Sequence, residues 1–266
     1  MTETAHRPPA VPPTGGARSS SPAVLVERLP ASVAGRLPMD AAEAFRDLPG
    51  LALLESARPG RRARWSFVTA DPVDVVEAVS EGPDPFAAAR SLLDRLKASA
   101  LADAGLPPFL AGLVGFIGYD VGLALSSRRT VAVDDQGLPP LRLALHDWVV
   151  AWDRRTGAAW LGGRAVDGDV GALHRRIDRV RERLIDGLAR DRGGATALAP
   201  DEPLEFVSNL GRTAFEDGVG SVRDAIARGD IYQANLTRRL ETPFEGDPWP
   251  LYRCLRTGDP ALFSAY

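Results

Sequence analysis

The sequence has 266 residues, of which 45% are hydrophobic and 25% are charged, values that are ordinary for a globular protein of one large or two modest domains. Its formal net charge of −3 gives no general attraction to nucleic acid or to an anionic membrane, so we expect neither as a partner. Cys254 is the single cysteine, and the histidines His6, His146 and His174 are far apart. The sequence therefore predicts no disulfide framework, no metal site in this chain, and a reducing, cytoplasmic compartment.

The first hundred residues predict strands around one amphipathic helix. Residues 1–22 are rich in Pro, Gly and Ser and lack the apolar core of a signal peptide, which indicates a disordered arm. Runs of apolar and β-branched residues predict strands, and these cover residues 23–29, 51–56, 64–70 and 73–79. A short helix is expected after Asp40, and a longer one from Asp84 to about residue 103. The expected buried face of the longer helix carries Phe86, Ala89, Leu93, Leu96 and Ala100.

Residues 109–125 form an apolar segment that has to be tested as a membrane span. The segment is shorter than the roughly 20 apolar residues that a spanning helix needs. It contains Asp120 near its centre, and such a residue costs about 2.5–3.5 kcal/mol in a membrane. Glycines at 112, 115, 118 and 122 also weaken a helix. We therefore expect no membrane insertion, and we expect these glycines to allow bends or close backbone approach rather than phosphate binding.

The second half alternates strands with two further helices. A hairpin is expected between residues 143–153 and 158–162, followed by a helix from Asp169 whose apolar residues recur at helical spacing. The arginines on its other face indicate a solvated surface or, alternatively, a surface for a partner. After a Gly- and Pro-rich linker, the sequence from Thr213 to Glu216 predicts a capping box that opens a helix with a buried apolar stripe. Gly229 then predicts the helix end, and a strand is expected over residues 231–241.

Few residues are placed where catalysis would need them. The sequence contains no dinucleotide-binding glycine pattern and no phosphate-binding loop. His146 and Asp147 are adjacent on an expected strand and point to opposite faces, so they cannot act as a base with its orienting carboxylate. Glu55 stands on an otherwise apolar strand, where its carboxylate needs either an arginine such as Arg64 or a ligand.

Gln233 and Asn235 lie two residues apart on an expected strand and therefore share one face. If that face is buried, both amides need hydrogen-bonding partners. The residues alone leave two interpretations open, a structural role or the lining of a pocket.

Several motifs together resemble one known family. Residues 229–239, GDIYQANLTRR, are similar to a block shared by the large subunits of chorismate-utilising enzymes, such as anthranilate synthase and aminodeoxychorismate synthase. The same families have elements that resemble LLES at 53–56, RWS at 64–66, PFLAGLVGFIGYD at 108–120 and LFSAY at 262–266. Within this resemblance Asn235 favours the aminodeoxychorismate branch, because the anthranilate branch usually has an apolar residue there.

The resemblance implies an α+β fold in which two antiparallel β-sheets pack as a sandwich with helices outside. It also implies an effector pocket between the sheets for tryptophan or a similar amino acid. Ser56, Phe263 and Ser264 match positions of that pocket, and Glu55 and Arg64 lie beside them. The serines are expected to hydrogen-bond the polar end of the ligand.

The family's chemistry, by contrast, matches no residue of this chain. In the family, ammonia from a glutaminase subunit replaces a hydroxyl of chorismate at a Mg²⁺-dependent site, and the aminodeoxychorismate branch uses a nucleophilic lysine in a PIKGT segment. Lys97 is the single lysine here, and its surroundings differ from that segment. We therefore expect no catalytic residue and no Mg²⁺ ligand in these residues.

The expected organisation is an arm (1–22), an N-terminal component I domain (23–190), a linker (191–204) and the start of a chorismate-binding domain (205–266) that is incomplete at its C-terminus. The favoured hypothesis is a fragment of the large subunit of aminodeoxychorismate synthase, which forms 4-amino-4-deoxychorismate for p-aminobenzoate and folate synthesis. Anthranilate or salicylate-type synthases are the enzymatic alternatives. A hypothesis of another class is a non-catalytic module that binds an amino-acid effector.

Overall fold

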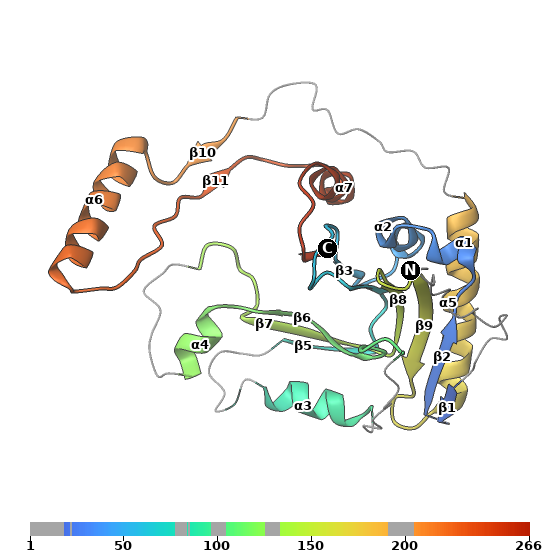
Figure 1. Ribbon diagram of the computed structural model, residues 1–266. Helices are drawn as coiled ribbons and strands as arrows, with labels where there is room; N and C mark the ends of the chain where they lie inside the picture. The colour runs from blue at the N-terminus through green and yellow to red at the C-terminus, as the bar shows by residue number, and fades with distance from the viewer. Residues whose placement is uncertain are drawn as a thin grey trace, which may run out of the picture. The chain divides into compact units, whose positions relative to one another are not determined.

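The computed structural model describes residues 19–21, 23–77, 84, 86–96, 105–125, 134–190 and 205–266. The chain divides into a first unit, formed by residues 1–194 and 255–266, and a second unit, formed by residues 195–254. Figure 1 labels the helices and strands of both units. Lys97 and the expected linker at 191–204 lie outside the described residues.

The first unit is built on a seven-stranded antiparallel sheet with the order β1-β2-β9-β8-β4-β3-β12. In that order the strands are Ser19–Ser21, Val24–Arg28, Ala158–Arg164, Trp148–Asp153, Trp65–Thr69, Ala52–Glu55 and Ser264–Ala265. The expected disordered arm is wrong for Ser19–Ser21, which pair with β2. Composition missed this strand because backbone pairing needs no apolar side chain.

A second antiparallel sheet has the order β5-β7-β6, with strands Asp74–Glu77, Leu141–His146 and Gly112–Ile117. The chain passes from this sheet to the larger one at Asp147, between β7 and β8. The single strand expected over 143–153 is therefore wrong, although the hairpin of β8 and β9 is confirmed. The run gave no sign of the break because its residues are buried on both faces of β8, which removes the alternation that marks a strand.

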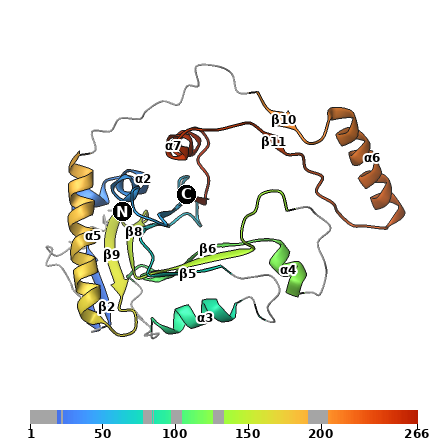
Figure 2. The ribbon, with the colours of Figure 1, turned by 180° about the vertical axis from the view of Figure 1, so that it is seen from behind.

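Helices cover the two sheets from outside, as Figures 1 and 2 show from opposite sides. They are α1 (Ala31–Ala34), α2 (Pro38–Ala42), the 3₁₀ turn η1 (Glu43–Phe45), α3 (Ala87–Asp94), α4 (Asp120–Leu125) and α5 (Val170–Arg190). The stripe predicted for α5 is confirmed, because Leu173, Ile177, Val180, Leu184 and Leu188 are buried. These features confirm the α+β fold with antiparallel sheets.

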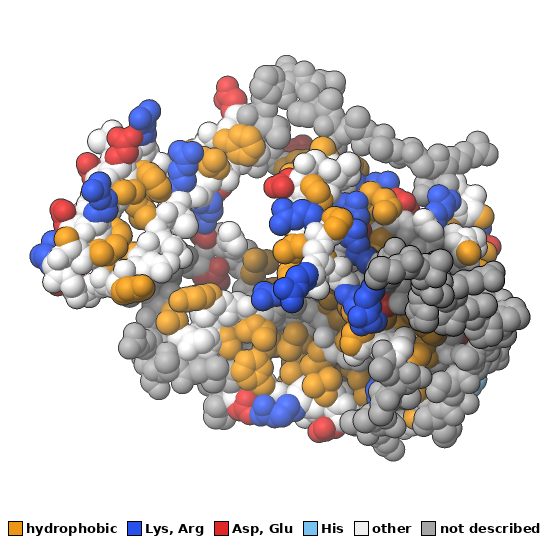
Figure 3. All heavy atoms as spheres, in the orientation of Figure 1, with side chains coloured by type: hydrophobic (Ala, Val, Ile, Leu, Met, Phe, Trp, Pro, Cys, Tyr) orange, Lys and Arg blue, Asp and Glu red, His pale blue; other side chains and the backbone are white. Residues whose placement is uncertain are grey.

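Helix α3 lies on the three-stranded sheet, with contacts to all of its strands. Ala89 and Leu96 are buried as expected, but Leu93 is 44% exposed, so its place on the buried face is wrong. The helix is short, with its described part ending at Asp94, and Leu96 belongs to the turn that follows. Figure 3 shows hydrophobic side chains over this sheet, and Phe116 and Ile117 at the end of β6 are among the exposed ones.

The apolar segment at 109–125 contains strand β6 and the short helix α4 rather than one helix. Gly115 has φ of +159°, and a Cβ atom there would lie 1.9 Å from the carbonyl oxygen of Arg142 on β7. The expectation of close backbone approach is confirmed at this glycine. In the described part of the chain, no helix is long and apolar enough to cross a membrane.

The second unit contains β10 (Val207–Ser208), α6 (Arg212–Arg228) and β11 (Leu240–Glu241), and α7 (Pro248–Gly258) begins in it and ends in the first unit. The predicted C′ glycine is confirmed, since Gly229 is left-handed with φ of +80°. The capping box is wrong, because the N-cap is Gly211 and no side chain caps the helix. The expected buried stripe of Phe215, Val219, Val222 and Ile226 is also wrong, because α6 has no buried residue.

The strand expected over 231–241 is confirmed only for Leu240–Glu241, which pair with β10. A strand needs a neighbour for its backbone groups, and among the described residues no strand pairs with residues 231–239. Gln233 and Asn235 are exposed on this extended segment.

Candidate functional site

The centre of the candidate site is Glu55, the last residue of strand β3. Its side chain is 1% exposed although the residue is charged. Burial of a carboxylate without partners is strongly unfavourable, so a cation has to accompany it. That cation is Arg256 near the end of α7, whose Nη2 and Nε atoms lie 2.7 and 3.0 Å from the two oxygens of Glu55.

The expectation that an arginine pairs with Glu55 is therefore confirmed, but the residue suggested for it, Arg64, is wrong. Arg64 makes its own two-pronged bond to Asp153 on β8, with distances of 3.0 and 2.8 Å. The hydrogen bond from Arg64 holds the pKa of the Asp153 carboxyl below its ordinary value. The guanidinium of Arg64 also lies 4.8 Å from the ring centre of Trp65, so its orientation is fixed by both partners.

Ser56 follows Glu55 and is buried at 4% exposure. Its hydroxyl donates to the carbonyl of Trp65 at 2.8 Å, and its backbone N–H donates to Oγ of Ser66 at 3.0 Å. A serine hydroxyl has one proton and two lone pairs. Since the proton is used, Ser56 can offer an approaching ligand a hydrogen-bond acceptor.

Four of the five residues expected in an effector pocket lie around one hollow of about 520 Å³. They are Glu55, Ser56, Phe263 and Ser264, and Arg64 is absent from the lining. The remaining lining comes from Leu54, Arg62, Trp65, Phe67 and Ala265. The hollow therefore combines an aromatic wall with a few polar groups, which is the usual make-up of a small-molecule site.

The aromatic wall comes from alternate residues of strand β4. Trp65 and Phe67 point to the same side of the sheet and stack with ring centres 6.2 Å apart. Phe67 in turn meets the edge of Phe109, which precedes β6, at 5.8 Å. The hollow lies on the seven-stranded sheet, and its lining residues come from β3, β4, β12 and adjoining loops rather than from both sheets as expected.

The sequence pattern of the chorismate binding enzymes matches residues 51–266. The chain belongs to the chorismate-binding enzyme family. It is 32% identical over 240 residues to anthranilate synthase component 1 of Mycolicibacterium smegmatis, a match that covers 81% of this chain and 44% of that protein. It is 23% identical over 227 residues to aminodeoxychorismate synthase component 1 of Bacillus subtilis, covering 80% of this chain and 47% of that protein.

A solved structure supports the fold. Anthranilate synthase component I from Streptococcus pneumoniae TIGR4 superimposes with a TM-score of 0.54 at 22% identity, covering 77% of this chain and 47% of that one. The chain thus spans less than half the length of each of these three relatives.

Among the residues that the structure describes, there is no group of three or more His, Cys, Asp or Glu side chains that could hold a metal ion. His146 and Asp147 also differ in environment, because His146 is buried against Thr69 whereas Asp147 bonds Arg176 on α5.

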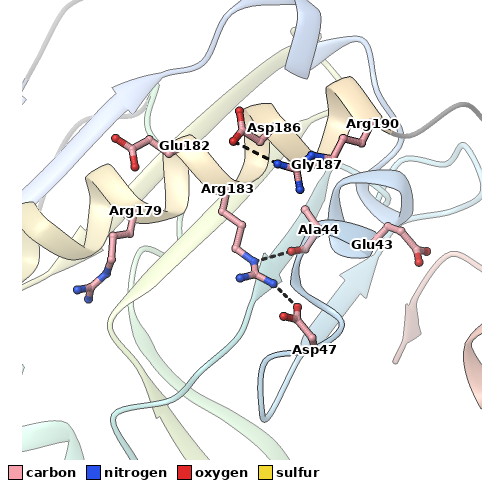
Figure 4. Close-up of a pocket in the computed structure, with 9 residues that line it drawn as sticks. All are labelled: Glu43, Ala44, Asp47, Arg179, Glu182, Arg183, Asp186, Gly187 and Arg190. Atoms are coloured by element: carbon pink, nitrogen blue, oxygen red, sulfur yellow. Dashed lines mark hydrogen bonds and ion pairs between the residues drawn. The ribbon is translucent and has the colours of Figure 1, made fainter.

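Another hollow, of about 790 Å³, lies between α5 and η1, and Figure 4 shows its residues. Several of its charged groups have partners: Arg183 donates to the carbonyl of Ala44 at 2.6 Å and pairs with Asp47, while Arg190 lies 3.7 Å from Asp186. The arginine face of α5 is thus partly engaged with neighbouring elements rather than fully solvated. Because this groove has no aromatic residue in its lining and several of its charges are paired, it is a weaker candidate than the hollow beside Glu55.

Sequence reasoning missed Arg256 and the two aromatic residues of β4. Arg256 is 201 residues from Glu55 along the chain, and nothing in the local pattern of α7 distinguishes it from other arginines. Trp65 and Phe67, however, alternate with buried residues on β4. The sequence already placed Trp65 and Phe67 on one face of this strand, opposite to Ser66 and Val68.

Proposed function

We propose that this chain is the effector-binding part of the large subunit, component I, of an enzyme that aminates chorismate. The observation that supports the proposal is the hollow of about 520 Å³ in which Ser56 and Ser264 lie beside Trp65, Phe67 and Phe263. Aromatic rings favour a flat apolar body such as indole. The free acceptor of Ser56 suits the ammonium group of an amino acid.

For the product, we propose 4-amino-4-deoxychorismate, the precursor of p-aminobenzoate. Asn235 supports this branch, since the anthranilate branch usually has an apolar residue at the matching position. Anthranilate is the second candidate, because the similarity to anthranilate synthase component 1 is 32% whereas that to aminodeoxychorismate synthase component 1 is 23%. A cytoplasmic location, a glutaminase partner that supplies ammonia and a Mg²⁺ ion bound by residues outside this chain complete the proposal.

Calorimetric titration with L-tryptophan tests the effector site. We expect saturable binding by the 266-residue chain, and a Phe263→Ala variant should bind about tenfold more weakly, because an aromatic pair contributes about 0.5–1.5 kcal/mol beyond buried area. Phe263 is 68% exposed, so its removal should leave the fold intact. Phe206→Ala is the matched control, since Phe206 is 57% exposed and does not line the hollow. Absence of heat at millimolar tryptophan would contradict the effector site.

The product is tested with the protein as its gene encodes it, supplied with chorismate, ammonium and Mg²⁺. Separation of the products by chromatography and mass spectrometry distinguishes aminodeoxychorismate from anthranilate. Formation of anthranilate would refute the favoured product and support the second candidate. Tryptophan binding without amination of chorismate would favour a non-catalytic effector-binding module.

A further inference from the structure

One wall of the hollow is held by a very short strand. Phe263 and Ser264 stand at β12, a strand of only two residues at the edge of the sheet. Its pairing with β3 includes two hydrogen bonds between Leu53 and Tyr266, at 3.0 and 2.9 Å, and the preceding loop adds one from Arg58 to the carbonyl of Ala261 at 2.9 Å. A two-residue edge strand with these bonds is marginal alone, since neutral hydrogen bonds contribute only about 0.5–1.5 kcal/mol each.

The bond between Arg256 and Glu55 is of a different kind. It joins the end of α7, seven residues before Phe263, to the residue of β3 that pairs with Ser264. The side chains are 13% and 1% exposed, so water screens the pair little. Two parallel charge-assisted bonds also fix the direction of both side chains, which a single neutral bond does not.

We propose that Arg256 is a positioning residue, which holds the segment 255–266 on β3 and thereby places Phe263 and Ser264 at the hollow. The inference rests on the proposed effector site and assigns to it the residue that sets its affinity. The ligand need not touch Arg256, because the effect passes through the position of β12.

The surroundings of the pair allow Arg256 to be replaced without collapse of the fold. Glu55 and Arg256 both border a second cavity of about 320 Å³, which is also lined by Ser66, Asp153 and Arg154. A cavity of this size that contains several polar side chains has room for water. Water can therefore solvate Glu55 when the guanidinium is removed, whereas in an apolar core the unpaired carboxylate would unfold the protein.

The test compares Arg256→Gln and Arg256→Lys with a matched control in the 266-residue chain. The control is Arg181→Gln, which removes another two-pronged pair between a helix and a strand, with Arg181 lying 2.5 and 3.0 Å from the oxygens of Glu27. Two quantities are measured in each protein: hydrogen exchange at the amides of Leu53 and Tyr266, and the dissociation constant for L-tryptophan.

We expect Arg256→Gln to accelerate exchange at Leu53 and Tyr266 by about tenfold or more and to weaken tryptophan binding by at least as much. Arg256→Lys should give exchange rates and a dissociation constant between those of Arg256→Gln and the wild type, because lysine keeps the charge but cannot make the two parallel hydrogen bonds of a guanidinium. Arg181→Gln should change neither quantity beyond about twofold.

Unchanged exchange at both amides in Arg256→Gln would overturn the inference, whatever the ligand does. An equal rise in exchange in Arg181→Gln would also overturn it, because the effect would then be a general loss of stability. If the wild type binds no tryptophan, the effector site fails, and the exchange of the β3–β12 amides still decides the role of Arg256. Faster exchange with unchanged affinity overturns the assignment of ligand affinity to Arg256.

Discussion

His146 makes the stability of the first unit depend on pH in a way that can be calculated. The side chain is 1% exposed, and its Nδ1 lies 3.0 Å from Oγ1 of Thr69. The Thr69 hydroxyl donates its one proton to the carbonyl of Trp148 at 2.7 Å, so Nδ1 must donate to Thr69. Burial lowers the pKa of His146 to about 4, an effect that a hydrogen bond to the backbone of Ala70 opposes and the charge of Arg176 reinforces.

The direction of the pH dependence follows from the number of protons that the folded and unfolded states bind. The unfolded chain has a histidine with a pKa of 6.5, so between pH 6.5 and about 4 the unfolded state binds a proton that the folded state does not. The stability contribution of neutral His146 is therefore complete above pH 6.5 and is lost as the pH falls toward 4. The gap between the two pKa values corresponds to about 3 kcal/mol, with about 1.4 kcal/mol per pH unit.

The assay is urea unfolding, followed by tryptophan fluorescence, of the wild type and a His146→Asn variant between pH 4 and 8. Asparagine keeps an N–H donor for Thr69 and does not ionise. Burial also raises the pKa of Asp147, but this group and the other carboxyls are present in both proteins and cancel in the comparison. We expect the wild type to lose about 3 kcal/mol more than the variant between pH 7 and 4. Parallel curves for the two proteins would refute the assignment of a neutral, buried His146.

Three further experiments test the packing. Gly115→Ala should lower the free energy of unfolding by more than about 3 kcal/mol, because the added Cβ would overlap a backbone oxygen of β7. Gly122→Ala, whose Cβ would meet open space, should change the free energy of unfolding by less than about 1 kcal/mol. Equal denaturation midpoints for the two variants would contradict this prediction. Asp153→Ala should lower the free energy of unfolding in urea by about 3 kcal/mol, since the Asp153 side chain is 2% exposed and its removal leaves Arg64 without its partner. Arg46→Ala, which removes the more exposed pair with Glu43, should lower it by only about 0.5 kcal/mol. Similar losses in the two variants would contradict the prediction. Leu184→Ala, at a site with 0% exposure on α5, should cost about 2–5 kcal/mol, and a cost below about 1 kcal/mol would show that α5 does not pack as described.

The sequence predicted those parts of the fold whose signals are local. The spacing of Leu173, Ile177 and Leu184 identified α5 and its buried face, because a long helix with one covered side leaves a 3.6-residue period. The left-handed conformation of Gly229 was predictable for the same reason, since the helix end needs it whatever packs nearby.

Features that depend on distant segments could not be predicted. The change of sheet at Asp147 occurs within a run that is buried on both sides of the break, so no alternation marks it. The apolar positions of α6, such as Val219, have helical spacing, but spacing does not reveal what covers a helix. The candidate hollow itself was located from motifs, while its charge partner Arg256 depended on a contact between residues 201 positions apart.

The long separation between Glu55 and Arg256 has a consequence for how the site forms. Strands β3 and β4 are joined by a short loop and can pair early, because closing a short loop costs little conformational entropy. Their edge, however, is completed only when Ser264, 209 residues further along the chain than Glu55, reaches β3. The hollow is therefore absent from any partly folded state that lacks this last pairing. Tryptophan binding at this hollow would report the folding of the first unit as a whole, and its affinity would fall sharply with any change that loosens β12.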